Sequence, residues 1–442
     1  MNINTKPLSG FMELLPGEQA AFDNIKNLIE ETYNTFGFTS LDTPLIERSE
    51  ILLAKGSQET DNQIYFVTNG LLSKDSTALA LRFDLTVPLA RYVAEHYNDL
   101  TFPFRRCHIG KVYRGERAQK GRFREFYQCD IDVIGNNNLS IYYDAEIPSI
   151  IYKIFKQLNL GKFKIKISNR KIFNGLFSEF NITAPFSHVL RIIDKSLKVT
   201  KDQLIQEFKE INLDQTQIKN LLKFMDVNGS VEDVLKNLQL LNIQNDDFNQ
   251  GLMELKSVTD TLITLNVDKN YFEIDLSIVR GLDYYTGTVY ETVLEDSRIG
   301  SVCSGGRYDN LASHYTSQQL PGVGISIGLT RLFWQLKEHG LLNNINKTVA
   351  QVVVIPNDKT NLTEAIKVAT YLRDRKIKTD LLLEDMQIKK KFAYVDNLNT
   401  PYTIVVKTIE GNETLSLQYK EKSEIIKKQL SLDSIAQLIT TN

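Results

Sequence analysis

The sequence is poor in the residues that build disulfide frameworks and zinc sites. It has three cysteines in 442 residues, Cys107, Cys129 and Cys303, and no two of them form a Cys-x-x-Cys pair. The five histidines also lack the spacing of metal ligands. Neither a disulfide framework nor a thiolate zinc site is supported. Structural or solvent-facing roles are expected for all of these side chains.

Long apolar runs and an excess of positive charge are also missing. The N-terminus has no apolar signal region, and no apolar run approaches the roughly 20 residues that cross a membrane. A cytoplasmic protein without a membrane segment is therefore expected. The net charge is −2, so any polyanion must be bound through local clusters and not by a general basic coat.

The sequence does contain enough apolar residues for more than one core. Its hydrophobic content of 42% and charged content of 24% are ordinary for a folded globular protein. A chain of 442 residues exceeds what one hydrophobic core supports, so two or three domains are expected.

The most informative stretch covers residues 104–135. Its two ends are rich in aromatic and β-branched residues and its middle carries glycines and charges, which predicts two strands joined by a long polar hairpin loop. On the second strand Gln128, Asp130 and Asp132 alternate onto one face. Such a face either meets solvent or lines a polar pocket.

Basic residues crowd this hairpin. The only carboxylates around the loop are Glu116 and Glu125. The cations around it are Lys111, Arg114, Arg117, Lys120, Arg122 and Arg124. So much like charge in a short stretch costs free energy unless an anion such as phosphate shares the site. The charges alone do not decide between a phosphate site and a solvated basic hairpin.

Residues 79–92 predict a strand followed by a helix. Thr86 is placed as the N-cap and Pro88 lies in the first helical turn, where its missing N–H costs little. Arg82, Asp84 and Thr86 project to the same side of the strand. A carboxylate and a hydroxyl together suit an ammonium group, and a structural ion pair between Asp84 and Arg82 is the alternative.

A second informative stretch covers residues 271–291. We expect two strands flanking a turn at residues 286–287, with Arg280 and the adjacent Tyr284 and Tyr285 just before it. Adjacent residues of an extended chain point to opposite faces, so at most one tyrosine enters the pocket that Arg280 lines. Its ring and hydroxyl suit an imidazole or other polar ring, and a tyrosine packed in the core is the alternative.

Glycines mark the two segments that follow. The pair Gly305-Gly306 permits a tight turn and close backbone approach. Residues 323–334 predict a buried strand that passes through Gly328 into a helix with Arg331 in its first turn. A cation there opposes the helix dipole by roughly 0.3 to 1 kcal/mol, and a bound phosphate would reverse that penalty. An arginine that bends into water is the alternative.

Two further regions differ from the rest. Residues 204–265 are mostly charged helical sequence without a catalytic constellation, which is typical of an inserted helical domain. From residue 348 onward strands are expected at 352–355, 379–383, 402–406 and 415–419, and helices at 362–375, 388–397 and 431–440. This alternation favours a mainly parallel sheet covered by helices. The lysine run at 389–391 either meets phosphates or is a solvated helix face.

These segments together resemble the histidyl-tRNA synthetases, which are class II aminoacyl-tRNA synthetases. The likeness spans essentially the whole chain and is carried by Tyr113-Arg114-Gly115-Glu116-Arg117, Phe123-Arg124-Glu125-Phe126-Tyr127-Gln128, Arg280-Gly281-Leu282-Asp283-Tyr284-Tyr285 and Gly305-Gly306-Arg307-Tyr308-Asp309. It implies an α/β fold with an α+β catalytic core, in which helices flank an antiparallel sheet. The implied domains are a core over 1–340, a helical insertion at 172–266 within it and an α/β anticodon-binding domain at 348–442.

The resemblance also implies a reaction. The carboxylate of histidine attacks the α-phosphate of ATP to give histidyl-adenylate and pyrophosphate, and the terminal ribose of the tRNA then takes the histidyl group. Arg114 and Arg280 are the implied catalytic residues, and Arg280 lies between the histidine carboxylate and the α-phosphate. Arg114, Glu116 and Arg331 are implied to bind ATP, which carries Mg²⁺. No metal site built from protein side chains is implied.

The implied histidine site uses residues from several segments. Its members are Asp84, Thr86 and Gln128 for the α-ammonium group, Asp132 and Tyr285 for the imidazole, Tyr308, which closes the pocket, and Arg280. Many bacterial members have glutamate where this chain has Asp84 and Asp132. Arg117 and Gln119 are implied to touch the acceptor end of tRNA(His), and a homodimer is implied.

Two other functions stay open from the sequence. A non-catalytic paralogue of this family regulates ATP phosphoribosyltransferase in histidine biosynthesis, and it tends to lose the arginines and the C-terminal domain, both of which are present here. A plain RNA-binding protein would not need pocket carboxylates at alternating strand positions.

Overall fold

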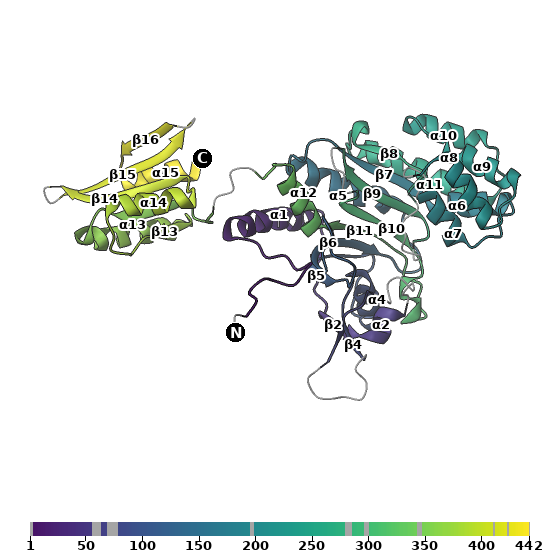
Figure 1. The fold of residues 1–442 in the computed structure, drawn as a ribbon, viewed down its shortest axis with the longest axis horizontal. Coiled ribbons are helices and arrows are strands. Elements are labelled where there is room, and N and C mark those ends of the chain that lie inside the picture. The colour runs from purple at the N-terminus through teal and green to yellow at the C-terminus, as the bar shows by residue number, and fades with distance from the viewer. Residues whose placement is uncertain are drawn as a thin grey trace. The chain divides into compact units, whose positions relative to one another are not determined.

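The computed structural model describes residues 3–54, 63–68, 78–194, 199–278, 285–295, 300–342, 347–409, 412–421 and 424–441. The chain divides into two compact units (Figure 1). The first comprises Met1–Met12 and Ile25–Leu341, and the second comprises Glu13–Asn24 and Leu342–Asn442. The partition into a core, a helical insertion and an anticodon-binding domain stays a proposal.

An eight-stranded sheet forms the centre of the first unit. Its order is β1-β5-β6-β11-β10-β9-β7-β8. The strands are β1 (Thr39–Ser40), β5 (Phe104–Tyr113), β6 (Glu125–Ile134), β7 (Phe163–Asn169), β8 (Phe272–Ile274), β9 (Thr288–Leu294), β10 (Cys303–Tyr308) and β11 (Gly322–Gly328). The pairings from β5 across to β7 are antiparallel, whereas β1 with β5 and β7 with β8 are parallel. The antiparallel sheet and the hairpin of β5 and β6 are confirmed.

The strands β8 and β9 lie before and after residues 286–287, as expected, and they do not pair with each other because β7 lies between them. The tight turn that the double glycine was expected to permit is wrong. Gly305 and Gly306 lie inside β10 and make no turn. Close backbone approach is confirmed, since a Cβ on Gly305 would lie 2.1 Å from the carbonyl oxygen of Gly324.

Helices cover the apolar face of the sheet. The helices α1 (Pro16–Thr35) and α5 (Tyr143–Gln157) both donate or accept hydrogen bonds there. The Tyr33 hydroxyl of α1 donates to the Cys129 carbonyl at 3.0 Å, and the Tyr290 hydroxyl of β9 donates to the Asp144 carbonyl of α5 at 2.6 Å. The opposite face of the sheet is therefore left to carry polar groups.

A small three-stranded sheet and the helix α4 also belong to the first unit. Here β2 (Ile46–Arg48), β4 (Leu79–Leu81) and β3 (Phe66–Val67) pair in that order, with α2 (Ser49–Leu53) alongside. The helix α4 runs over Thr86–Glu95, so Pro88 does lie in its first turn. Thr86 is not the N-cap, because that position is Leu85. The Asp84 carboxylate accepts from the Val87 N–H at 3.1 Å and takes over the capping role.

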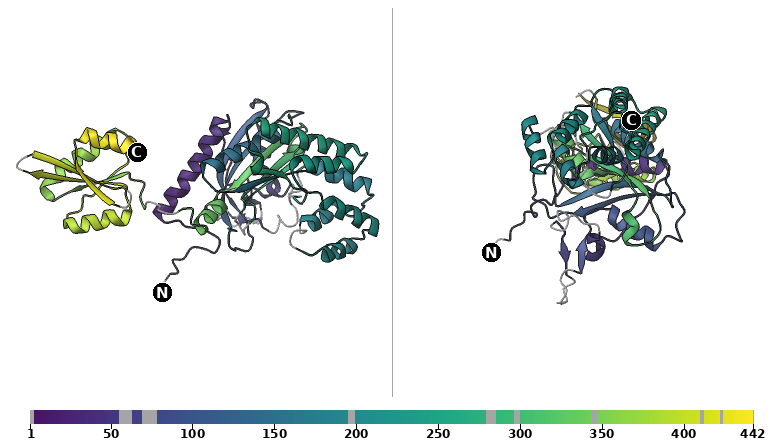
Figure 2. Two further views of the ribbon diagram at one scale, coloured as in Figure 1. Left: turned by 90° about the horizontal axis from the view of Figure 1, so that it is seen from above. Right: turned by 90° about the vertical axis from the view of Figure 1, so that its right-hand side faces the viewer.

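The helices that the structure describes between β7 and β8 gather at the end of the sheet where these two strands lie (Figures 1 and 2). They are α6 (Arg170–Glu179), α7 (Phe186–Asp194), α8 (Lys201–Glu210), α9 (Gln215–Met225), α10 (Val231–Leu240) and α11 (Asp246–Thr264). A Cβ on Gly175 of α6 would lie 2.4 Å from the Phe248 nitrogen of α11, so glycine allows these two helices to touch. None of the described helices is long and apolar enough to span a membrane.

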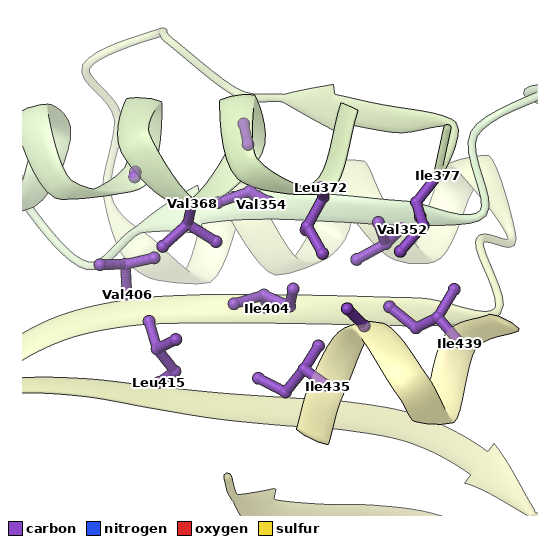
Figure 3. Close-up of a cluster of buried hydrophobic side chains, with 13 residues drawn as sticks. Val352, Val354, Val368, Leu372, Ile377, Ile404, Val406, Leu415, Ile435 and Ile439 are labelled. Atoms are coloured by element: carbon purple, nitrogen blue, oxygen red, sulfur yellow. The ribbon is translucent and has the colours of Figure 1, made fainter. Parts of the chain in front are cut away.

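The second unit contains a five-stranded sheet of order β13-β12-β14-β15-β16. Its elements are β12 (Val352–Pro356), α13 (Leu362–Asp374), β13 (Thr379–Leu381), α14 (Ile388–Leu398), β14 (Tyr402–Ile409), β15 (Asn412–Glu421), β16 (Glu424–Gln429) and α15 (Leu432–Thr441). The expected mainly parallel sheet is wrong, because β14, β15 and β16 pair antiparallel. Figure 3 shows the core where Leu372, Ile404 and Ile435 meet.

The three lysines at 389–391 in the second unit differ in their exposure to solvent. Lys389 and Lys390 are exposed on α14. Lys391 is only 2% exposed, and its ammonium donates to the Pro356 carbonyl at 2.7 Å. Lys391 therefore cannot meet tRNA phosphates in this structure.

Candidate active site

Strand register builds the floor of the site. Residues directly opposite on paired strands share a face, and two rows cross β5, β6 and β11: Arg106–Asp132–Gly324 and His108–Asp130–Ser326. Asp130 and Asp132 are each only 3% exposed. The polar face of β6 is therefore buried inside the protein and does not meet solvent.

Asp132 is held by two neighbours. One carboxylate oxygen lies 2.8 Å from the Arg106 guanidinium, and the other accepts from the Tyr308 hydroxyl at 2.8 Å. Burial raises the pKa of Asp132, and Arg106 and Tyr308 oppose that rise. A Cβ on Gly324 would lie 2.1 Å from the carboxylate, so only glycine fits beneath it. The structure thus brings the predicted Asp132 and Tyr308 together.

Arg106 is a site residue that the sequence reasoning did not single out. It is fully buried, and besides Asp132 it donates to the Leu85 carbonyl at 3.1 Å. Two of its nitrogens, Nε and Nη1, have no hydrogen-bond partner within the described segments. Only the register between β5 and β6 reveals its role, because the sequence alone does not say which residue faces Asp132.

Asp84 lies in the same electrostatic environment. Burial raises its pKa to about 6, against the Val87 N–H and the cations Arg114 and Arg106, while Asp132 adds to the rise. Arg82 does not pair with Asp84; it pairs with Asp42 at 3.1 Å, so the alternative of an Asp84–Arg82 ion pair is wrong. Asp84, Arg106 and Asp132 come from three separate segments of the chain, and the charges of Arg106 and Asp132 both act on Asp84.

Gln128 and Thr86 are the other two residues of the predicted ammonium site. The Gln128 side-chain amide donates to the Ser326 hydroxyl at 2.8 Å, and its Oε1 has no partner among the described residues. Thr86 opens α4 and is half-buried. Burying an amide oxygen without a hydrogen-bond donor costs free energy. Such an unpaired acceptor is expected where a ligand supplies the missing donor.

The predicted nucleotide residues Arg114 and Arg331 lie next to the same sheet, directly after β5 and in the helix that follows β11. The Arg114 side chain donates through Nε to the Phe83 carbonyl at 3.0 Å, and its guanidinium lies 5.2 Å from the Phe126 ring centre. Arg331 is the third residue of α12 (Leu329–Glu338) and is half-buried. Next to it, the Thr330 hydroxyl accepts from the Tyr127 N–H at 2.8 Å, which ties α12 to β6.

The hairpin loop holds the remaining predicted contacts. Glu116 lies 3.2 Å from Arg122, and its backbone carbonyl accepts from the Arg124 side chain at 3.0 Å. Arg117 and Gln119 are exposed. Glu116 is thus fixed within the loop, while the other two side chains face outward.

Tyrosines form the apolar side of the pocket. Tyr285 is partly buried and packs against a cluster that includes Tyr308, Leu89 and Leu311. A Cβ on Gly306 would lie 2.9 Å from the Tyr285 ring, so the ring lies over β10. Arg280 and Tyr284 fall outside the described residues, and their predicted roles stay predictions.

Arg307 and Tyr308 point to opposite faces of β10. While Tyr308 faces the pocket, Arg307 faces the covering helix α5, where it contacts Asp144 through Nη2 at 2.6 Å and through Nε at 3.1 Å. Both side chains are buried. This pair clamps β10 to α5, and no sequence pattern identified Asp144 as the partner of Arg307.

Sheet and site together define a class. An antiparallel sheet backed by helices, with Arg114 after β5 and Arg331 in the first turn of α12, is the arrangement that the resemblance to class II aminoacyl-tRNA synthetases implies.

Comparison with known proteins identifies the family within that class. The model of the family described as histidyl-tRNA synthetase matches residues 10–332, and that of the anticodon binding domain matches residues 351–442. The chain belongs to the histidyl-tRNA synthetase family. A histidine--tRNA ligase from Clostridium tetani is 53% identical over 435 residues, which cover 95% of this chain and 97% of that protein.

Solved structures agree. A histidyl-tRNA synthetase from Nostoc sp. PCC 7120 superposes with a TM-score of 0.90 at 38% identity and full coverage of both chains. A chain from Bacillus halodurans C described as an ATP phosphoribosyltransferase regulatory subunit/histidyl-tRNA synthetase has a TM-score of 0.74 at 22% identity, covering 92% of this chain and 99% of its own. This second likeness shows the fold alone.

Proposed function

We propose that this protein ligates L-histidine to tRNA(His). The histidine carboxylate attacks the α-phosphate of ATP and releases pyrophosphate, and the terminal ribose of the tRNA then attacks the histidyl carbonyl and releases AMP. The observation that carries the proposal is the buried, charge-paired Asp132 in a chain of this family. A buried carboxylate paired with a guanidinium suits the N–H of an imidazole ring.

The arginines are proposed to stabilise charge at phosphorus. Arg114 and Arg280 would neutralise the α-phosphate as the carboxylate attacks, and Arg331, with Glu116 nearby in the hairpin loop, would hold the rest of the nucleotide. Hydrogen bonds to charged groups contribute about 1.5 to 3 kcal/mol each. Because charge grows in the transition state, loss of these contacts should lower rate more than binding.

The remaining pocket residues are proposed to select histidine. Asp84, Thr86 and Gln128 would bind the α-ammonium group. Asp132 and Tyr285 would bind the imidazole, with Tyr308 closing the pocket through its bond to Asp132.

The partners follow from the same proposal. Mg²⁺ is proposed to arrive on the ATP phosphates. We further propose that Arg117 and Gln119 meet the tRNA acceptor end, that the second unit binds the anticodon, and that the protein acts as a cytoplasmic homodimer.

Charging of tRNA tests the proposal. Purified protein, ATP, Mg²⁺ and labelled histidine should give acid-precipitable histidyl-tRNA with tRNA(His) and none with a tRNA for another amino acid. Formation of no aminoacyl-tRNA, or of one carrying another amino acid, would contradict the proposal. Heat-denatured protein and omission of ATP are the controls.

A further inference from the structure

Asp130 is a buried carboxyl of the site for which the proposed function has no use. It lies between Gln128 and Asp132 on the same face of β6 and is only 3% exposed. Successive residues on one face are about 6.8 Å apart, so Asp130 stands between the proposed ammonium and imidazole contacts.

One hydroxyl connects Asp130 with Gln128. Ser326 lies opposite Asp130 in the register of β11, and hydrogen bonding by its side chain lowers the pKa of the Asp130 carboxyl. A serine hydroxyl has a single hydrogen, so once it donates to Asp130 it can only accept from Gln128. The Gln128 amide N–H does donate to Ser326, at 2.8 Å.

This relay, which runs from Asp130 through Ser326 to Gln128, determines which acceptor oxygens remain without a hydrogen-bond donor. With its NH₂ group turned to Ser326, Gln128 leaves Oε1 without a donor, and Asp130 leaves Oδ1 without one, among the described residues. Together with the Asp84 carboxylate, the site then offers three acceptors. An ammonium group has three N–H donors.

We propose that Asp130 is a third ligand of the substrate's α-ammonium group and that Ser326 is a positioning residue that holds the Gln128 amide in its accepting orientation. The inference rests on the proposed function and extends it. Without Ser326 the amide could turn its NH₂ group toward the ammonium, and without Asp130 one ammonium N–H would lose its acceptor.

The charges around Asp130 fit a cation. Burial raises the pKa of Asp130 to about 7, Asp132 and Asp84 add to the rise, and Arg106 and the Ser326 bond oppose it. His108 faces Asp130 from β5, and burial together with Arg106 and Arg82 lowers its pKa to about 3, so it is neutral. An arriving ammonium therefore finds acidic groups that release protons as it binds.

Two histidine analogues test the proposal. L-Histidinol keeps the ammonium and the imidazole but lacks the carboxylate, whereas imidazolepropionate keeps the ring and the carboxylate but lacks the ammonium. Calorimetry on the full chain compares wild type with Asp130→Asn and Ser326→Ala. Ser304→Ala is the matched control, because Ser304 is the next residue in the same row, on β10.

The expected result is selective. Asp130→Asn and Ser326→Ala weaken histidinol binding about tenfold or more, change imidazolepropionate binding less than about threefold, and leave the Tm of the Ser326→Ala variant near wild type. Ser304→Ala binds both analogues like wild type. In buffers of different ionisation enthalpy at pH 6.5, wild type releases more protons on binding histidinol than Asp130→Asn does.

Other outcomes overturn the proposal. Equal weakening of both analogues would assign Asp130 to the ring or to folding, and unchanged histidinol binding in Ser326→Ala would remove the relay. A wild-type protein that binds neither histidine nor histidinol would overturn the proposed function as well, which distinguishes the two failures.

Discussion

At the scale of single residues, the site depends on acidic side chains that are buried beside arginines. Asp84, Asp130 and Asp132 are all almost inaccessible to solvent. Buried carboxylates resist ionisation unless cations or donors compensate, and Arg106 supplies part of that compensation to each of the three.

Histidine binding should weaken in acid. Burial is the main cause that raises the pKa of Asp84 to about 6. A protonated Asp84 cannot attract an ammonium group. The protonation of this residue alone should therefore weaken the affinity for histidine about fourfold at pH 5.5 relative to pH 8. Its effect on stability has the opposite sign: the contribution is fully present below the unfolded pKa of 3.8 and is lost as pH rises through about 6.

Calorimetry of histidinol binding between pH 5.5 and 8 measures this effect. Imidazolepropionate is the control, because it reports the titration of the ring without the ammonium. An equal pH dependence for both analogues would rule out the role given to Asp84.

Removing Arg106 should destabilise the protein through Asp132. Arg106→Met leaves a buried carboxylate without its cation, which costs about 3 to 5 kcal/mol at pH 8 and less in acid, where Asp132 can take a proton. Denaturant unfolding measures the loss. The double variant Arg106→Met/Asp132→Asn should regain most of the stability and still fail to bind histidine; a double variant as unstable as the single one would contradict this account.

The residue types of the site could be predicted, but their partners could not. Alternation on the second hairpin strand placed Gln128, Asp130 and Asp132 on one face, and the structure confirms that this face lines a polar interior. Arg106 and Ser326 were missed because their roles follow from strand register, which pairs residues far apart in sequence.

At the scale of elements, local patterns predicted most helices and strands well. The hairpin of β5 and β6 and the helices α13, α14 and α15 formed close to their expected bounds. The errors arose where the surroundings overrode local preference. Asp84 caps α4 in place of Thr86, and Gly305 and Gly306 serve strand packing in β10 in place of a turn.

The glycine beneath Asp132 gives a test at this scale. In Gly324→Ala the new Cβ would lie 2.1 Å from the Asp132 carboxylate, so the carboxylate must move and histidine affinity should fall more than about tenfold, with a stability loss of about 1 to 3 kcal/mol. Gly328→Ala is the control, since its nearest atom would be 3.6 Å away. Equal losses in both variants would contradict the assigned role of Gly324.

At the scale of the whole molecule, the sequence predicted more than one folded unit and the family to which the chain belongs. It could not predict the antiparallel half of the second sheet, because β16 was missed and an alternation of strands and helices favours parallel pairing.

Burial within the second unit predicts how its lysines behave toward tRNA. The variant Lys389→Gln/Lys390→Gln should lower the slope of log K against log salt by about one to two, since each exposed lysine can meet one phosphate. Lys391→Gln should leave the slope unchanged and lower the Tm, because Lys391 is buried against the Pro356 carbonyl. Filter binding across a salt series measures the slopes, and a change of slope in Lys391→Gln alone would contradict the assignment.

The central claim is that one buried acidic pocket beside the arginines activates histidine. Amino-acid-dependent exchange of labelled pyrophosphate into ATP measures this step without tRNA. We predict exchange with histidine and none with the other standard amino acids. Exchange that requires a different amino acid, or that occurs with none, would contradict the account.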